Sequence, residues 1–170
     1  MFPLKLIAGV NMGVEIERKY LVNRGLWDKT SKDNRHFVKQ GYMLNKPGKT
    51  IRVRLTDNKG CITIKGISTG AARTEFEYEI PEEDSKELLE SFCDSLVSKI
   101  RNNIIYKDKL WEVDEFLDDN AGLIIAEIEL SDEEELFDLP EWIEKEVTGE
   151  EKYYNSNLSV HPFKEWKNEV

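Results

Sequence analysis

Charged and apolar residues alternate in short stretches along most of the chain. In residues 14–20, Glu15, Glu17 and Lys19 occupy every second position, and the positions beside them are mostly apolar. Successive side chains of a β-strand point to opposite faces, so this spacing predicts a strand with one charged and one apolar face. Similar patterns predict further strands at residues 37–45, 51–55, 62–65, 73–80, 99–106, 110–116 and 123–130.

Ionisable side chains on these stretches come in pairs of like charge, two residues apart. The pairs are Glu15 and Glu17, Arg52 and Arg54, Lys99 and Arg101, and Glu127 and Glu129. One such strand could simply expose its charged face to water, but repetition on several strands favours a shared charged interior. We therefore predict an α+β fold: a closed antiparallel β-barrel that forms a tunnel, with a charged lumen and helices packed outside.

Three segments have helical features. Residues 23–32 predict a short helix or turn that covers the barrel. Pro81 and the acids after it are typical of a first helical turn. Helical spacing then continues through Leu88, Leu89, Phe92, Leu96 and Val97. A third, short helix is expected to begin at Ser131, with acids in its first turn, and to end near Pro140.

The length of 170 residues fits a single domain. We expect residues 1–11 to be an N-terminal extension and residues 12–170 to form one tunnel domain; Met12 is an alternative start. The extension is too short to span a membrane, and no membrane association is expected. The formal net charge of −10 argues against general nucleic-acid binding through a basic surface.

Cysteine and histidine are scarce, which limits the chemistry of any metal site. Cys61 and Cys93 form no disulfide framework or metal-binding spacing, so we expect free thiols in a cytoplasmic protein. The two histidines, His36 and His161, cannot form a three-histidine zinc site. Carboxylates remain as metal ligands, and they favour hard cations such as Mg²⁺ or Mn²⁺.

The charged stretches also form an ordered series of motifs from about Val14 to Leu158. These are Glu15-x-Glu17-x-Lys19, Arg52-Val-Arg54, Thr63-Ile-Lys65-Gly66, Arg73-x-Glu75-x-Glu77, Lys99-x-Arg101, Trp111-Glu-Val-Asp114-Glu-Phe116, Ala126-Glu127-Ile-Glu129-Leu130, Glu146-Val-Thr148-Gly149 and Lys152-Tyr153-Tyr154-Asn155. In this series the chain resembles short bacterial members of the CYTH superfamily, the triphosphate tunnel metalloenzymes. The resemblance implies a tunnel fold and a metal-dependent activity on a triphosphate.

A triphosphate enclosed by protein has to be surrounded by cations, because burying its charges unpaired is prohibitively unfavourable. The candidate substrate-binding residues are Lys19, Arg52, Arg54, Lys65, Arg73, Lys99 and Arg101. Arginine can grip phosphate oxygens in bidentate fashion, whereas lysine acts as a point charge. Tyr42 stands where relatives often have a tunnel tyrosine, but a core position is equally consistent with the sequence.

Acids beside a phosphate chain repel it unless a divalent cation lies between them. The resemblance implies that Glu15, Glu17, Glu127 and Glu129 hold this ion; Glu75, Glu77 and Asp114 are candidates for a second ion or for orienting the bases. Glu17 and Lys152 are the candidate catalytic residues, and Lys152 would position the attacking water.

The expected activity is metal-dependent hydrolysis of a small triphosphate, with inorganic tripolyphosphate as the substrate, in a monomer or homodimer. The same tunnel would also suit thiamine triphosphate hydrolysis or adenylate cyclase activity, and the paired motifs do not separate these. A noncatalytic polyphosphate- or nucleotide-binding module is a further alternative, although it would not need four glutamates with metal spacing. Buried ion pairs contribute little net stability, so a purely structural role for the charged lumen is disfavoured.

Overall fold

The computed structural model describes residues 14–69 and 71–168 of the chain. Residues 1–11, the predicted extension, and Met12 lie outside this part, so their expected roles stay predictions. Eight antiparallel strands form the barrel. They are β1 (Val14–Val22), β2 (Arg35–Lys46), β3 (Lys49–Thr56), β4 (Lys59–Thr69), β5 (Ala72–Ile80), β6 (Leu96–Tyr106), β7 (Lys109–Phe116) and β8 (Ile124–Glu129).

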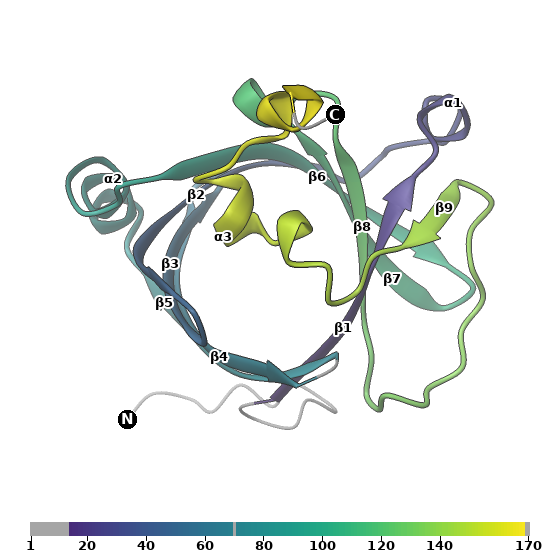
Figure 1. Ribbon diagram of the computed structural model, residues 1–170, viewed down its shortest axis with the longest axis horizontal. Coiled ribbons are helices and arrows are strands. Elements are labelled where there is room, and N and C mark those ends of the chain that lie inside the picture. Colours follow the sequence, from purple (N-terminus) through teal and green to yellow (C-terminus); the bar gives the residue numbers. More distant parts are fainter. Residues whose placement is uncertain (1–13, 70, 169–170) are drawn as a thin grey trace.

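The sheet runs in the order β5-β4-β3-β2-β6-β7-β8-β1 and closes where β1 pairs with β5, with Glu15 opposite Arg73. Figure 1 looks along the barrel, and the strands form a ring. A short ninth strand, β9 (Ile143–Glu146), pairs with the far end of β1. The predicted closed antiparallel barrel is therefore confirmed.

Two helices lie outside the ring, and a C-terminal group covers one end of its interior (Figure 1). The outer helices are α1 (Arg24–Trp27) and α2 (Glu82–Ser91). The inner group contains the 3₁₀ turn η2 (Glu151–Tyr153) and α3 (Asn155–Leu158). Two further 3₁₀ turns are η1 (Asp118–Asn120) and η3 (Phe163–Asn168). Among the described residues, none of the helices has the length and hydrophobicity that a membrane-spanning helix needs.

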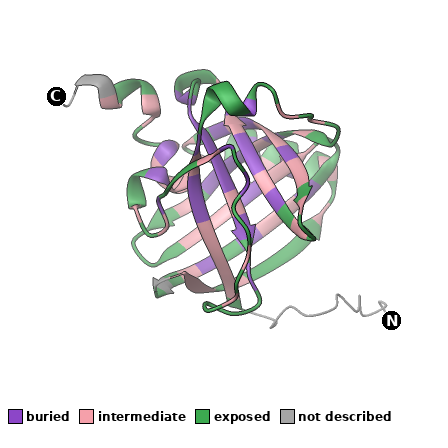
Figure 2. Ribbon diagram, turned by 90° about the vertical axis from the view of Figure 1, so that its right-hand side faces the viewer, coloured by how far each residue is buried: buried purple, intermediate pink, exposed green. Residues whose placement is uncertain are grey.

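The main apolar core lies on the outer face of β1, β7 and β8. Trp27 and Trp111 are fully buried there, and both rings make edge-to-face contacts with Trp142. Figure 2 faces this side of the molecule, where buried stretches follow the strands. The covering is incomplete elsewhere: Phe76 and Tyr78 on β5 are 49% and 58% exposed. The expectation of helices over the outer face thus holds for only part of the barrel.

A second apolar cluster fills one end of the barrel's interior. Val97, Phe116 and Ile125 share the inner face with the charged residues, and the C-terminal Tyr153 and Leu158 pack onto them. The prediction of a charged interior is therefore correct for the rest of the lumen but not for this end, where apolar side chains and the C-terminal segment exclude water.

The predicted helix after Pro81 ends earlier than its spacing indicated. α2 stops at Ser91, and the amide of Phe92 donates to the Leu88 carbonyl as the last cap bond. Leu96 and Val97 instead begin β6, where Val97 is 2% exposed in the interior cluster. Burial in the barrel outweighs local helical spacing here.

The short helix expected between Ser131 and Pro140 is also wrong, because this segment forms turns and extended chain. The Glu135 carboxylate accepts hydrogen bonds from both the amide and the hydroxyl of Ser131. The Asp132 carboxylate accepts from the amide of Glu134. These side chains take backbone donors in local turns, which competes with helix formation.

Candidate active site

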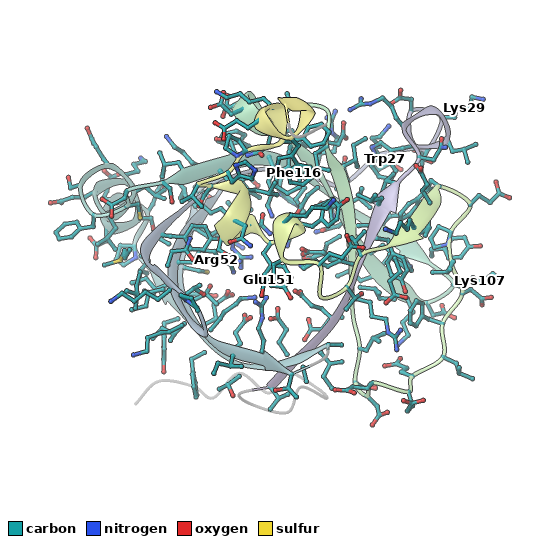
Figure 3. All side chains as sticks on the ribbon, in the orientation of Figure 1. Trp27, Lys29, Arg52, Lys107, Phe116 and Glu151 are labelled. Atoms are coloured by element: carbon teal, nitrogen blue, oxygen red, sulfur yellow. The ribbon has the colours of Figure 1, made fainter. Side chains whose placement is uncertain are left out.

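A cavity of about 190 Å³ lies within the charged part of the lumen. Residues from seven of the eight barrel strands line it, because the alternation of each strand turns every second side chain inward. Its cationic lining residues are Lys19, Arg52, Arg54, Lys65, Arg73 and Arg101. Its acidic ones are Glu15, Glu17, Glu75, Glu77, Glu112, Glu127 and Glu129. The side chains of opposite charge thus share one enclosed space (Figure 3).

Glu15 links two bases across the closure of the barrel. Its carboxylate accepts from Lys65 Nζ at 2.8 Å and from Arg73 Nε at 2.8 Å. Arg73 also donates to Glu17, and Lys65 pairs with Glu75. Burial alone would lower the pKa of Arg73, but Glu17 and Glu15 hold it above its ordinary value. Arg73 therefore stays charged, and Arg73 and Lys65 both already have anionic partners.

Lys19 and Arg101 share the buried carboxylate of Glu127. Lys19 Nζ lies 2.5 Å from Glu127 Oε1 and 2.8 Å from Glu17 Oε1, and Arg101 Nη2 lies 3.1 Å from Glu127 Oε2. Burial alone would raise the pKa of Glu127, but Lys19 and Arg101 hold it well below its usual range. Burial would likewise lower the pKa of Lys19, but Glu127 and Glu17 raise it. Lys19 and Glu127 are therefore both ionised at neutral pH.

Lys99 and Asp114 form an ion pair one layer behind the cavity. They are 1% and 0% exposed, and Lys99 Nζ lies 2.6 Å from Asp114 Oδ2. Asp114 also receives two hydrogen bonds from Arg101. Burial lowers the pKa of Lys99 to about 8, although Asp114 opposes this shift. The paired spacing predicted their inward direction, but neither side chain lines the cavity.

Among the cationic residues that line the cavity, Arg52 has the longest separation from its nearest carboxylate. It donates to the Thr63 hydroxyl at 3.1 Å, and its separation from Glu77 is 3.8 Å. Its buried Nε has no hydrogen-bond partner among the described residues. Arg54 makes the closer contact with Glu77, at 3.1 Å. Arg52 therefore has donors that an anionic ligand could use.

Glu129 is the acid without a cation. Within residues 14–69 and 71–168 its carboxylate has no ion pair, and it faces the cavity near other carboxylates. Burial raises the pKa of Glu129, and repulsion from Glu15, Glu112, Glu75 and Glu17 raises it further. In the described residues, no three histidine, cysteine or acidic side chains converge closely enough to hold a metal ion. The unbalanced charge around Glu129 nevertheless fits a bound divalent cation.

The structure does not bring Lys152 to the cavity. Its side chain is exposed, and its ammonium lies 4.9 Å and 5.3 Å from the ring centres of Tyr153 and Trp166. Every other candidate site residue either lines the lumen cavity or, for Lys99 and Asp114, lies directly behind it.

Sequence reasoning did not identify Glu112 and Asn155 as site residues, and it left Tyr42 open. Glu112 lines the cavity and lies 2.5 Å from Arg101; its spacing from Asp114 matches the other pairs and could have identified it. Tyr42, which the sequence left between core and tunnel, lines a smaller cavity beside the first. Asn155 lines both cavities, but the irregular C-terminal segment has no periodicity that could have revealed it.

Two known proteins are similar to this chain over most of its length. The inorganic triphosphatase of Acetivibrio thermocellus is 45% identical over 157 residues, which is 92% of this chain and 99% of that protein. The crystal structure of the inorganic triphosphatase NE1496 has a TM-score of 0.60 and 27% identity, and it covers 86% of this chain and 94% of its own.

A more distant structure supports the fold alone. The Hippeastrum protein HpAC1, which has a dominant triphosphatase activity, superposes with a TM-score of 0.56 at 15% identity; the match covers 71% of this chain and 80% of that one.

The family profile for the CYTH domain matches residues 13–161, most of the sequence. This chain therefore belongs to the CYTH family.

Proposed function

We propose that the protein hydrolyses inorganic tripolyphosphate to pyrophosphate and phosphate in a reaction that depends on a divalent cation. The main observation in support is the central cavity, whose lining contains six cationic and seven acidic side chains. The 45% identity to an inorganic triphosphatase across nearly the whole chain supports the same activity. Water attacks the terminal phosphorus, the bridging P–O bond breaks, and pyrophosphate leaves.

The bases of the lumen bind the phosphate chain in this proposal. Arg52 donates to the Thr63 hydroxyl and lies 3.8 Å from Glu77, so it can turn to a phosphate oxygen without breaking a close ion pair. Lys19, Lys65, Arg73 and Arg101 are paired with carboxylates and have to share or exchange these partners for the substrate. Fixed cations around the chain also stabilise the charge that spreads over the phosphoryl oxygens during transfer.

When the bases bind the substrate, the carboxylates that were paired with them lose positive charge nearby and need a cation in its place. Substrate binding is therefore linked to metal binding. Glu15, Glu17 and Glu129 would hold a divalent ion, together with Glu127, and Glu75, Glu77 and Asp114 would orient the bases. When bound, such an ion neutralises phosphoryl charge and orients the phosphate chain or the attacking water. An all-carboxylate set favours Mg²⁺ or Mn²⁺. Glu17 contacts both Lys19 and Arg73 and thus joins the acidic and basic parts of the site.

The wider setting is part of the proposal. Cys61 and Cys93 are free thiols, which is consistent with a reducing, cytoplasmic environment. We expect a monomer or a homodimer without nucleic-acid or membrane partners, in which residues 12–170 act as one domain.

Phosphate release by the purified protein tests this proposal. Tripolyphosphate, ATP, thiamine triphosphate and pyrophosphate are each supplied with Mg²⁺, Mn²⁺ or EDTA, and cyclic AMP is measured from ATP. The proposal predicts fast, metal-dependent release from tripolyphosphate and slow release from the others. A preference for thiamine triphosphate, or cyclic AMP production, would replace the substrate assignment. Tight binding without turnover would instead indicate a noncatalytic module.

A further inference from the structure

The C-terminal segment contributes one residue, Asn155, to the lining of the central cavity. Asn155, the first residue of α3, lines the central cavity and also the smaller one beside it. Around these cavities it has Lys19, Arg52, Lys65 and Arg73 as co-lining residues. It is the one lining residue of the central cavity that carries no charge.

The contact with Lys99 fixes the orientation of the Asn155 amide. Lys99 Nζ donates to Asn155 Oδ1 at 3.0 Å. An ammonium group has three donors and no acceptor, so only the amide oxygen can face it. The Asn155 NH₂ group must then point away from Lys99. It has no hydrogen-bond partner among the described residues, and Lys99 itself is held by Asp114 at 2.6 Å.

The backbone around Asn155 is also held in place. Leu158, one turn later, is 1% exposed in the interior apolar cluster. Asn45 of β2 donates to the Ser156 carbonyl at 2.9 Å, and the hydroxyls of Ser95 and Ser159 are 2.9 Å apart. The side chain is thus positioned by packing and by contacts from two strand ends, which is how a binding site keeps a donor in place.

We propose that Asn155 is a substrate-binding residue that donates its amide to a phosphate oxygen, and that Lys99 is the positioning residue that orients it. The partially positive N–H groups of a neutral amide do not attract a cation. They can donate a hydrogen bond to an anionic oxygen that the surrounding cations also bind. This inference rests on the proposed function and deepens it, because it assigns a phosphate contact to the C-terminal segment.

Two substitutions at one position separate this role from structural support of Lys99. Asn155→Ala removes the donor, so KM for tripolyphosphate should rise about tenfold with a smaller change in kcat. Asn155→Asp keeps an oxygen for Lys99 but replaces the donor by a negative charge that faces the phosphate. If Asn155 binds substrate, the aspartate variant should be the worse of the two, with KM raised on the order of a hundredfold and no loss of thermal stability. If Asn155 only supports Lys99, the aspartate variant should match wild type.

Asn157 provides the matched control, since it lies on the same short helix and donates to the Glu151 carbonyl without lining either cavity. Asn157→Ala should leave KM unchanged. Calorimetric binding of tripolyphosphate is measured for all variants alongside turnover. Wild-type protein that binds but does not hydrolyse would overturn the proposed function, while its affinity relative to the two Asn155 variants would still test the inference. An Asn155→Asp protein with wild-type affinity and KM would refute the inference alone.

Discussion

The two faces of β1, β7 and β8 are built from the same strands but serve different ends. Outward residues such as Trp111 and Ile128 form a dry core beneath α1 and the loop before β9. Inward residues such as Glu112 and Glu127 line a cavity filled with ion pairs. Apolar burial supplies net stability, whereas buried ion pairs contribute little to it. The comparison indicates that the outer face holds the barrel together so that the inner face can carry a costly set of charges.

The largest expected effect comes from breaking the outer face. Trp111 is fully buried and its ring contacts Tyr20, Phe137 and Trp142. Trp111→Ala should lower the free energy of unfolding by about 3–5 kcal/mol, because it leaves a cavity in the main core. Chemical denaturation measures this change. The folded fraction should keep the wild-type KM for tripolyphosphate.

Phe37→Ala is the matched aromatic control, since Phe37 is 47% exposed on β2. It should change the unfolding free energy far less than Trp111→Ala. Equal losses in the two variants would contradict the view that stability is concentrated under α1 and beside β9.

An intermediate effect should follow from removing Arg52, the base of the inner face with the longest separation from a carboxylate. Arg52→Ala should raise KM for tripolyphosphate by about 10- to 100-fold, because a charge-assisted contact to phosphate is lost. Initial-rate kinetics measure KM, and thermal melting follows stability. The control is Lys49→Ala, which removes an exposed base from the start of the same strand. A KM shared by Arg52→Ala and wild type would remove Arg52 from the substrate site.

The smallest expected effect is that of Glu129→Gln on stability. Glu129 has no cation partner in the described part of the chain, and four neighbouring carboxylates repel its charge. Neutralising it should leave the melting temperature unchanged or slightly raised. A large drop in melting temperature would show that Glu129 supports the fold. This would contradict the view that the charges of the inner face do not stabilise the barrel.

Much of this arrangement could be predicted from residue alternation. The spacing of Glu15 with Glu17, and of Glu127 with Glu129, correctly indicated side chains on the inner face of two strands. The strands are neighbours in the β1–β8 ladder, where Glu17 lies opposite Glu129 and Lys19 opposite Glu127. Alternation gives the face of a residue but not its depth along the barrel. For that reason Lys99 was expected in contact with substrate, although it lies behind the cavity. Val97 was assigned to a helix for a different reason: helical spacing continues through it, although it packs inside the barrel.

The C-terminal segment could not be predicted in the same way. Its position depends on the packing of Tyr153 and Leu158 against β6, β7 and β8, which are distant in sequence. Nothing in the local pattern showed that Asn155 would enter the lumen while Lys152 stays outside over two aromatic rings. Residues placed by long-range packing on irregular chain carry no periodic pattern.

The most direct test of the account is phosphate release from tripolyphosphate by Glu129→Gln, measured over a range of Mg²⁺ concentrations beside wild-type protein. In the proposed site Glu129, which has no ion pair among the described residues, binds the activating cation together with Glu15, Glu17 and Glu127. This assignment predicts a folded variant whose turnover falls on the order of 100-fold and which requires more Mg²⁺ for its remaining activity. A folded Glu129→Gln protein with the wild-type rate and the wild-type Mg²⁺ dependence would contradict it.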